Sequence, residues 1–368
     1  MASEIKVGIV GAAGRGNSFL GAFQSDPRTV VTALCDVNQE RVREVASENS
    51  IEQTYADYET MLDKAGLDAV VVGTPMHLHA PQSIAALERN VSVLCEVTAG
   101  VSIEECRRVV EARNKSKATY MMAENYIYIR SNLLVGEIVK AGLLGEIYYG
   151  EGEYVHEIKA LELPTPWRRR WQTGINGNTY PTHQFGPLYQ WFGEQRAVSV
   201  CCFGSGHHYL DAEHRPYEIE DSTTTACRMA HGGLVNIRLD MLSERPHNAS
   251  YLQVQGTKGC YESARGLGDT NKIFLMDRHE PNTWHPLEEL ADEFLPDCWR
   301  AISEAARASG HGGGDYLQVT DFVDALVEGK EPSIGIHQSM DMTLVGLASQ
   351  LSIAQGSVWV DVPDSRTW

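Results

Sequence analysis

A glycine-rich turn between a short apolar strand and a helix is the feature that most constrains this chain. Residues 5–10 are β-branched and apolar, which predicts a buried strand. The turn Gly11–Gly16 follows, then a helical pattern over 17–24 and a second apolar strand over 30–35. Such a turn lets the backbone approach a pyrophosphate, and the helix N-terminus offers free N–H groups. This order predicts a dinucleotide site, with phosphate contacts from Gly11, Ala13, Gly14, Arg15 and Gly16.

An acidic residue stands where such a site needs one. Asp36 directly follows the second strand and lies 20 residues beyond Gly16. A carboxylate at this spacing hydrogen-bonds the ribose hydroxyls and repels a 2′-phosphate, so we expect NAD(H) rather than NADP(H). The alternative is a tight strand-to-helix turn without a ligand, and the flanking strands together with Asp36 argue against it.

Composition narrows the class of protein. The chain has 368 residues, 43% hydrophobic and 22% charged, which suits a globular protein of two domains. A net charge of −18 argues against nucleic acid and anionic membranes as partners. The eight cysteines form no CxxC pair and several lie in apolar runs, so we expect buried thiols in a reducing compartment. His207 and His208 adjoin each other, but no acid or cysteine pattern supports a metal site, so we expect none. The chain enters its first strand at once and has no apolar run of ~18 residues, so we expect a cytoplasmic protein without signal peptide or membrane span.

The pattern of predicted strands and helices changes near residue 125, which divides the sequence into two parts. Residues 1–125 alternate strands and helices, which predicts an N-terminal Rossmann domain, a doubly wound parallel α/β sheet. Residues 126–368 predict an α+β domain for substrate binding and oligomerisation, with a large, open, mostly antiparallel sheet. Its strands are expected at 147–155, 197–202, 223–228, 234–239 and 251–255, and helices over 316–328 and 337–355 are expected to pack back toward the Rossmann domain.

Ligands on parallel sheets bind at the carboxyl ends of the strands, so the residues after each strand are candidates for the cofactor site. Thr74, Pro75 and His79 follow the strand at 68–73, and Glu96 ends the strand at 91–96. Glu96 could bond the nicotinamide ribose. Capping of the next helix is the alternative for each of them.

The densest group of reactive side chains lies at 177–187. Tyr180 and His183 are three residues apart and meet on one face if the segment is helical, and both can exchange protons. Upstream, Arg168 and Arg170 lie between two tryptophans, a combination that suits a sugar. A structural histidine and a solvated basic run are the alternatives.

Alternation places Tyr154 and His156 on one face of the strand at 147–155. They could form a wall of the substrate pocket, although a lone strand tyrosine more often serves packing.

Together these residues resemble the Gfo/Idh/MocA oxidoreductase family, a Rossmann domain followed by an open sheet domain, over essentially the whole chain. In ordinary dehydrogenases of that family the strand ending at Glu96 continues Glu-Lys-Pro, and the lysine helps to move the hydroxyl proton. Here Val97 stands at the lysine position. Gly186 and Pro187 stand where those enzymes carry an acid.

The departures resemble one branch, the NAD-dependent glycosidases of glycoside hydrolase family 109, which are α-N-acetylgalactosaminidases. The matching pieces are Glu96-Val97, Glu124-Asn125, 154–157, 177–183, Gly186-Pro187, 254–259 and 310–313. The resemblance implies that Glu96, Val97, Asn125 and Tyr180 touch NAD, and that Tyr154, Tyr180, Thr182 and His183 touch the sugar. Ile175 replaces an expected arginine and His247 an expected tyrosine, both at positions that line the sugar pocket.

The resemblance implies a hydrolysis assisted by redox chemistry: oxidation at sugar C3, elimination across C1–C2, addition of water and re-reduction, with NAD recycled in each turnover. His183, Tyr180 and Tyr154 are the candidate bases, with their roles undivided. A net sugar or cyclitol dehydrogenase is the first alternative, and a non-catalytic NAD-binding protein the second. A small-molecule glycoside is the expected partner, and the resemblance implies a homo-oligomer, a dimer or a tetramer.

Overall fold

The computed structural model describes residues 4–245 and 248–368. Contacts divide the chain into two units. The first contains residues 1–128, 302–340 and 365–368, and the second contains 129–301 and 341–364. This division differs from a simple boundary at 125, because two later segments return to the first unit.

A six-stranded parallel sheet forms the centre of the first unit, in the order β3-β2-β1-β4-β5-β6. Its strands are β1 (Ile5–Val10), β2 (Thr29–Cys35), β3 (Gln53–Tyr55), β4 (Ala69–Val72), β5 (Ser92–Glu96) and β6 (Tyr120–Ala123). The four side chains of β4 are fully buried, as expected for a strand covered on both faces. The predicted Rossmann sheet is confirmed; the short strand β3 was not predicted.

Helices cover both faces of this sheet. They are α1 (Leu20–Ser25), α2 (Gln39–Glu48), α3 (Tyr58–Lys64), α4 (His79–Glu88) and α5 (Ile103–Lys115), with short 3₁₀ helices η1 (Arg15–Phe19), η2 (Met76–Leu78) and η3 (Asn125–Tyr128). Helices α4 and α5 pack against each other. The right-handed crossover rule puts α1, which connects β1 to β2, on the opposite face of the sheet from them. The helix predicted over 17–24 is split into η1 and α1.

The returning segment contributes α12 (Glu304–Arg307), η5 (Gly310–Gly313) and α13 (Gly314–Glu328) to the first unit. Helix α13 packs on α1 and η3. The last turn, η6 (Ser365–Thr367), belongs to the same unit. This segment brings side chains from the end of the chain to the glycine-rich turn.

The second unit is built on a nine-stranded sheet in the order β14-β13-β12-β11-β7-β10-β9-β8-β15. Its strands are β7 (Ile147–Val155), β8 (Ala197–Gly204), β9 (Ser222–Met229), β10 (Leu234–Asp240), β11 (Asn248–Gly256), β12 (Gly259–Glu262), β13 (Lys272–Leu275), β14 (His285–Pro286) and β15 (Val360–Asp361). All neighbours pair antiparallel except β7 and β10, which are parallel. The predicted open, mostly antiparallel sheet is confirmed.

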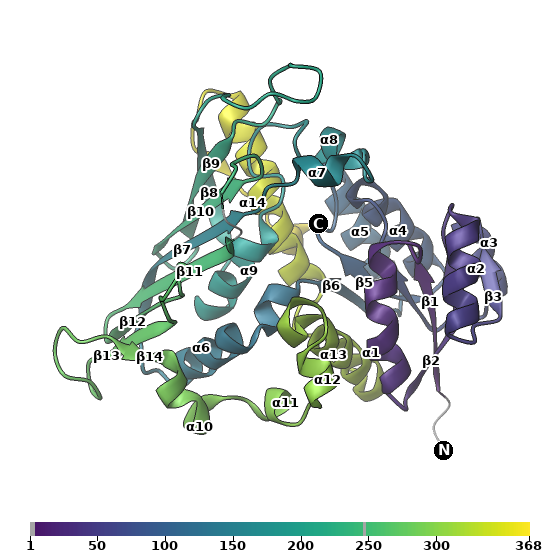
Figure 1. The fold of residues 1–368 in the computed structure, drawn as a ribbon, viewed down its shortest axis with the longest axis horizontal. Coiled ribbons are helices and arrows are strands. Elements are labelled where there is room, and N and C mark those ends of the chain that lie inside the picture. The colour runs from purple at the N-terminus through teal and green to yellow at the C-terminus, as the bar shows by residue number, and fades with distance from the viewer. Residues whose placement is uncertain (1–3, 246–247) are drawn as a thin grey trace. The chain divides into compact units, whose positions relative to one another are not determined.

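Helices gather on one face of the nine-stranded sheet. Figure 1 shows α6 (Arg130–Lys140), α9 (Thr182–Trp191) and α14 (Ile336–Ala354) on the same side of the strands. Helix α9 contacts β7, β10 and β11. Shorter elements complete the unit: α7 (Lys159–Glu162), α8 (Trp167–Trp171), η4 (Leu287–Leu290), α10 (Ala291–Phe294) and α11 (Asp297–Arg300).

Two sequence-level expectations concern the chain as a whole. Six of the eight cysteines are buried, Cys260 is half-buried and Cys298 is exposed, and all are free thiols. Within the part of the chain that the structure describes, no helix is long and apolar enough to cross a membrane.

Candidate functional site

The glycine-rich turn lies against the end of β4 in a space that admits no side chain. Gly11 has φ of 81°, and a Cβ there would lie 2.4 Å from the carbonyl oxygen of Gly73. A Cβ on Gly16 would lie 2.8 Å from the carbonyl oxygen of Gly11. Glycine is therefore required at both positions for the turn to pass this close to β4.

Asp36 closes the same turn from the end of β2. One of its carboxylate oxygens accepts from the backbone N–H of Ala13 at 3.0 Å, and the other accepts from Asn38 N–H at 2.9 Å. The side chain is half-buried. Since each carboxylate oxygen has a second lone pair, Asp36 keeps acceptor capacity for ribose hydroxyls.

The turn after β4 is organised by His79, which is 1% exposed. Its Nδ1 lies 2.7 Å from the carbonyl oxygen of Thr98 and its Nε2 lies 2.8 Å from that of Thr74. Burial lowers the pKa of His79, and the two carbonyls oppose this only in part. Both ring nitrogens lie within hydrogen-bond distance of backbone carbonyls, so the observed contacts of His79 are with the two turns that it joins. Cofactor contacts by Thr74, Pro75 and His79 stay predictions.

Arg15 is the centre of an ion network within the first unit. Its Nε donates to Glu96 at 2.7 Å, and its two terminal nitrogens donate to the two oxygens of Asp315 at 2.8 Å each. The guanidinium carbon lies 4.9 Å from the ring centre of Phe19. Burial lowers the pKa of Arg15, but the charges of Glu96 and Asp315 raise it overall. The sequence predicted Arg15 and Glu96 as site residues and missed Asp315.

These features fit a dinucleotide. From the general architecture of such sites we expect the glycine turn to meet a pyrophosphate and Asp36 to meet a ribose, and both contacts stay predictions. Beyond β6, Asn125 is 2% exposed, and its Oδ1 has no hydrogen-bond partner among the residues that the structure describes. A buried acceptor of this kind requires a donor, and NAD carries hydroxyl and carboxamide donors. Gly14 is exposed at the turn, and Val97 is buried beside Glu96.

A second group of predicted residues meets in the other unit. The ring centres of Tyr154 and His183 lie 5.0 Å apart, as do those of Tyr180 and His183, and the two tyrosine rings are stacked at 5.6 Å. The Tyr154 hydroxyl lies 2.8 Å from Nδ1 of His156. We call Tyr154, His156, Tyr180 and His183 the aromatic cluster. The structure thus joins residues that the sequence placed on two separate segments, 154–156 and 180–183.

Two elements position the aromatic cluster. Tyr154 lies near the end of β7, and His156 lies just after that strand. Tyr180 precedes α9, and His183 lies in its first turn. His183 and Tyr154 are 5% and 8% exposed, and Tyr180 is half-buried. Tyr180 therefore contacts His183 from the turn before the helix and not along a helical face.

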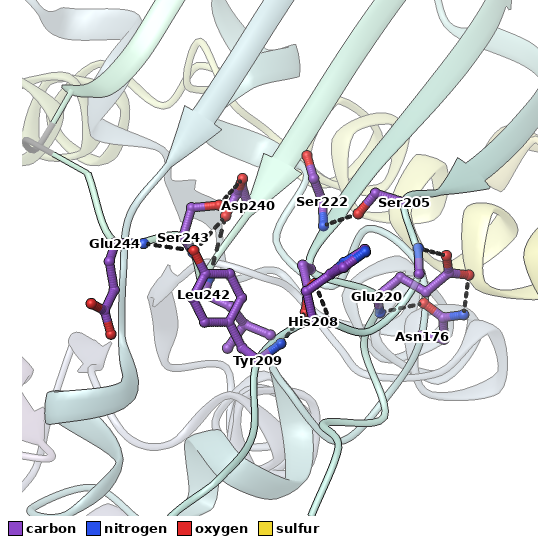
Figure 2. A network of polar contacts seen from close by, with 12 residues as sticks. Asn176, Ser205, His208, Tyr209, Glu220, Ser222, Asp240, Leu242, Ser243 and Glu244 are labelled. Atoms are coloured by element: carbon purple, nitrogen blue, oxygen red, sulfur yellow. Dashed lines mark hydrogen bonds and ion pairs between the residues drawn. The ribbon is translucent and has the colours of Figure 1, made fainter.

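A polar network joins loops that adjoin the segments carrying this cluster, and Figure 2 shows the network itself. Asn176 Oδ1 accepts from the backbone N–H groups of Gly177 and Glu220 at 3.0 Å each, and its Nδ2 donates to Glu220 at 3.2 Å. Asp240 accepts from Ser243 Oγ at 2.7 Å at the end of β10, beside the end of β7. The turn that carries Tyr180 is thus tied to the loop before β9. No local sequence pattern marks Glu220 or Asp240, so neither could be predicted from the sequence.

The predicted sugar-binding arginines are engaged with their neighbours. Arg168 lies 4.6 Å from the Trp167 ring centre and donates to Gln172 at 2.8 Å. The guanidinium of Arg170 lies 5.0 Å from the Trp171 ring centre, and Arg170 is exposed. The stacking of cations on indole rings is therefore present, and sugar contacts by Arg168 and Arg170 stay predictions.

The remaining predictions concern His247 and the absence of a metal site. His247 lies outside the described residues. In residues 4–245 and 248–368, no group of three or more His, Cys, Asp or Glu side chains is placed to hold a metal ion.

Comparison with known families matches both halves of the chain. Residues 5–124 match a family described as an oxidoreductase family with an NAD-binding Rossmann fold. Residues 128–367, more than half of the chain, match the C-terminal domain of glycosyl hydrolase 109. The chain belongs to the glycosyl hydrolase 109 family. The family resemblance inferred from the sequence is therefore confirmed.

Relatives of this family member align over nearly its full length. A glycosyl hydrolase family 109 protein of Saccharopolyspora erythraea is 28% identical over 98% of this chain and 83% of its own length. The α-N-acetylgalactosaminidase of Shewanella oneidensis is 27% identical over 98% of this chain and 84% of its own length.

Solved structures share the fold of this glycosyl hydrolase 109 chain. A levoglucosan dehydrogenase in complex with NADH and levoglucosan has a TM-score of 0.81 at 21% identity, covering 98% of this chain and all of the other. The WlbA dehydrogenase from Bordetella pertussis, in complex with NADH and UDP-GlcNAcA, has a TM-score of 0.77 at 20% identity, covering 99% of each chain. Family membership and fold together place this chain among NAD-dependent enzymes.

Proposed function

We propose that this enzyme hydrolyses a glycosidic bond by transient oxidation of the sugar at C3, with NAD recycled in each turnover. The observation that carries the proposal is the aromatic cluster, which gathers four side chains able to exchange protons in one place. Membership of glycosyl hydrolase family 109 supports the same reaction. Val97, at the position where ordinary dehydrogenases of the fold carry a lysine, argues against net oxidation.

When bound, NAD supplies a reversible hydride acceptor for C3 of the sugar. We assign it to the glycine turn, Asp36, Glu96 and Asn125 in the first unit, with Thr74, Pro75, His79, Val97 and Tyr180 as further predicted contacts. The chain's own residues then have to move protons. This route requires no pair of carboxylates flanking the glycosidic bond, unlike most glycosidases.

The aromatic cluster can supply the proton transfers. As C3 becomes a ketone, the C3 hydroxyl loses its proton to one base of the aromatic cluster. The ketone acidifies the C2 hydrogen, a second base removes that proton, and the C1 substituent leaves with its bonding electrons. Water adds at C1 while C2 is reprotonated, and reduction of C3 restores the sugar. His183, Tyr154 and Tyr180 are the candidates, and the Tyr154–His156 hydrogen bond offers a path for a proton out of the site.

The sugar is a separate part of the proposal. The Shewanella oneidensis relative is named as an α-N-acetylgalactosaminidase. Ile175 and His247 replace an arginine and a tyrosine expected to line the pocket, so we propose a different glycoside for this chain. We place Thr182 at the sugar because its hydroxyl is fully buried and has no hydrogen-bond partner among the described residues.

The decisive experiment follows hydrogen at C2. Purified protein is incubated in D₂O, without added NAD, with aryl glycosides of several sugars in both anomeric forms. We expect release of the aryl group together with deuterium at C2 of the product, measured by NMR, because elimination exchanges that proton with solvent. Cleavage with full retention of hydrogen at C2 would contradict the mechanism. Stoichiometric NADH formation from a free sugar would instead identify a dehydrogenase.

A further inference from the structure

The backbone of residues 310–314 lies close to the side chain of Asp315. The proposed function assigns no role to this segment or to Asp315. His311, Gly312 and Gly313 have consecutive positive φ values of 54°, 60° and 90°. A Cβ on Gly310 would lie 2.2 Å from a carboxylate oxygen of Asp315, and one on Gly314 would lie 2.5 Å from the carbonyl oxygen of Asn125. The backbone therefore approaches both Asp315 and Asn125 as closely as glycine permits.

Five donors from four side chains converge on the carboxylate of Asp315. Beside the two bonds from Arg15, Nδ2 of Asn125 donates at 2.8 Å, Nε2 of Gln318 at 3.2 Å, and Nδ1 of His311 lies at 3.0 Å. Asp315 is 2% exposed. Burial raises the pKa of this carboxyl, but the hydrogen bonds from Arg15 and His311 hold it well below its ordinary value. The carboxylate is ionised and can only accept hydrogen bonds.

This geometry decides which way two buried amides point. Because Asp315 only accepts, the NH₂ groups of Asn125 and Gln318 must face it, and their carbonyl oxygens are left for other donors. Oδ1 of Asn125 and Oε1 of Gln318 both lack a hydrogen-bond partner among residues 4–245 and 248–368. The two side chains are 2% and 0% exposed, so water does not reach them freely. Two orphaned acceptors beside one carboxylate call for a ligand with hydrogen-bond donors.

The strand order indicates which part of a dinucleotide meets them. Asp36 follows β2, on one side of β1 and its glycine turn, whereas Glu96 and Asn125 lie at the ends of β5 and β6 on the other side. A dinucleotide with its pyrophosphate at the glycine turn and its adenosine ribose at Asp36 extends its other half toward β5 and β6. That half carries ribose hydroxyls and the carboxamide NH₂.

We propose that Asp315 is a positioning residue for the nicotinamide half of NAD, because it clamps Arg15 and turns the amide oxygens of Asn125 and Gln318 toward the donors of the cofactor. The inference rests on the NAD-binding part of the proposed function and not on the glycosidase reaction. Asp315 itself acts through these three side chains.

The test compares two ligands on the NAD-free protein. Asp315→Asn replaces a pure acceptor by an amide, so Asn125 and Gln318 lose the reason for their orientation. By calorimetry we expect NAD⁺ to bind at least about 10-fold more weakly to this variant. ADP, which lacks the second ribose and the nicotinamide, should change by less than about 3-fold. Asp324→Asn is the matched control, since Asp324 lies on the same helix and pairs with Arg28 at 2.7 Å away from this network. It should bind both ligands like the wild type.

A second variant covers the case in which Asp315→Asn does not fold, which thermal melting would show. Gln318→Met keeps the length of the side chain and removes its amide, and we expect a selective loss of about 3-fold or more for NAD⁺ over ADP. Equal losses for NAD⁺ and ADP in the folded variants would show a merely structural role and overturn the proposal, as would unchanged NAD⁺ affinity. A wild-type protein that binds NAD⁺ but cleaves no glycoside would refute the proposed reaction and leave this inference standing.

Discussion

Tyr154, at a single strand position, contacts three side chains that can exchange protons, Tyr180, His183 and His156. Alternation along β7 places the Tyr154 side chain on the helix-covered face of the sheet, where it contacts Tyr180 and His183. The sequence predicted that Tyr154 and His156 share a face, and their 2.8 Å hydrogen bond confirms the contact. Whether Tyr154 holds the sugar or moves a proton stays a prediction.

Removing the Tyr154 hydroxyl separates chemistry from cofactor binding. We expect Tyr154→Phe to lower kcat by about 10²- to 10⁴-fold, the usual contribution of a group that transfers protons. Bound NAD, measured after denaturation, should be unchanged because the glycine turn and Asp36 are untouched. Tyr149→Phe is the matched control: Tyr149 lies on the same strand, on the opposite face, and its hydroxyl bonds Glu151. Equal kcat values for the two variants would contradict a role for Tyr154.

At the scale of elements, α9 depends on glycines in the strand beneath it. A Cβ on Gly152 would lie 2.1 Å from the carbonyl oxygen of Gln184, and one on Gly150 would lie 3.1 Å from Leu188. The helix that carries His183 therefore sits against the backbone of β7 itself. This close contact sets the distance between His183 and Tyr154.

Gly152→Ala should disturb this contact. Since the carbonyl of Gln184 is backbone and cannot turn away, we expect a loss of stability of about 1–3 kcal/mol from overpacking, with a fall in kcat as His183 moves. Gly136→Ala in α6 is the control, because its Cβ would find ordinary contact at 3.8 Å and should stabilise the helix by about 0.5–1 kcal/mol. Denaturant unfolding measures both. If Gly152→Ala were no less stable than Gly136→Ala, the packing argument would fail.

At the scale of the whole molecule, the first unit is assembled from three separate stretches of chain. The last of them, 365–368, is held by a 2.9 Å contact between Ser365 Oγ and Nδ1 of His337 and by the Trp368 ring, 5.3 Å from the guanidinium of Arg107. Ser365 is fully buried. The unit that carries the dinucleotide turn is therefore completed only when the C-terminus returns.

Deleting residues 365–368 should weaken this unit. We expect the free energy of unfolding to fall by about 1–3 kcal/mol through lost burial and the lost hydrogen bond. Saturating NAD should restore part of the loss, since a ligand that binds only the folded state stabilises it by mass action. Thermal melting with and without NAD measures both effects. An unchanged midpoint for the shortened chain would show that the tail contributes nothing.

The sequence by itself determined what depends on near neighbours. The strand 5–10, the helix at 103–115 and the strand at 147–155 follow from local periodicity, and the structure confirms them. The glycine turn and Asp36 were recognised from local turn chemistry, and their contacts with a dinucleotide stay predictions. The family signature in 177–183 was readable for the same reason, because its residues are contiguous.

Only the tertiary structure decided the partners of those residues. Asp315 reaches Arg15 across 300 positions of sequence, and Glu220 reaches Asn176 across 44. Ion pairs and hydrogen bonds act over a few ångströms. The spacing of residues along the sequence does not predict which distant carboxylate lies next to a given donor in the folded chain. The orientation of the Asn125 amide depends on such a long-range contact, the hydrogen bond from its Nδ2 to Asp315. The same contact leaves the amide oxygen as an acceptor for the cofactor.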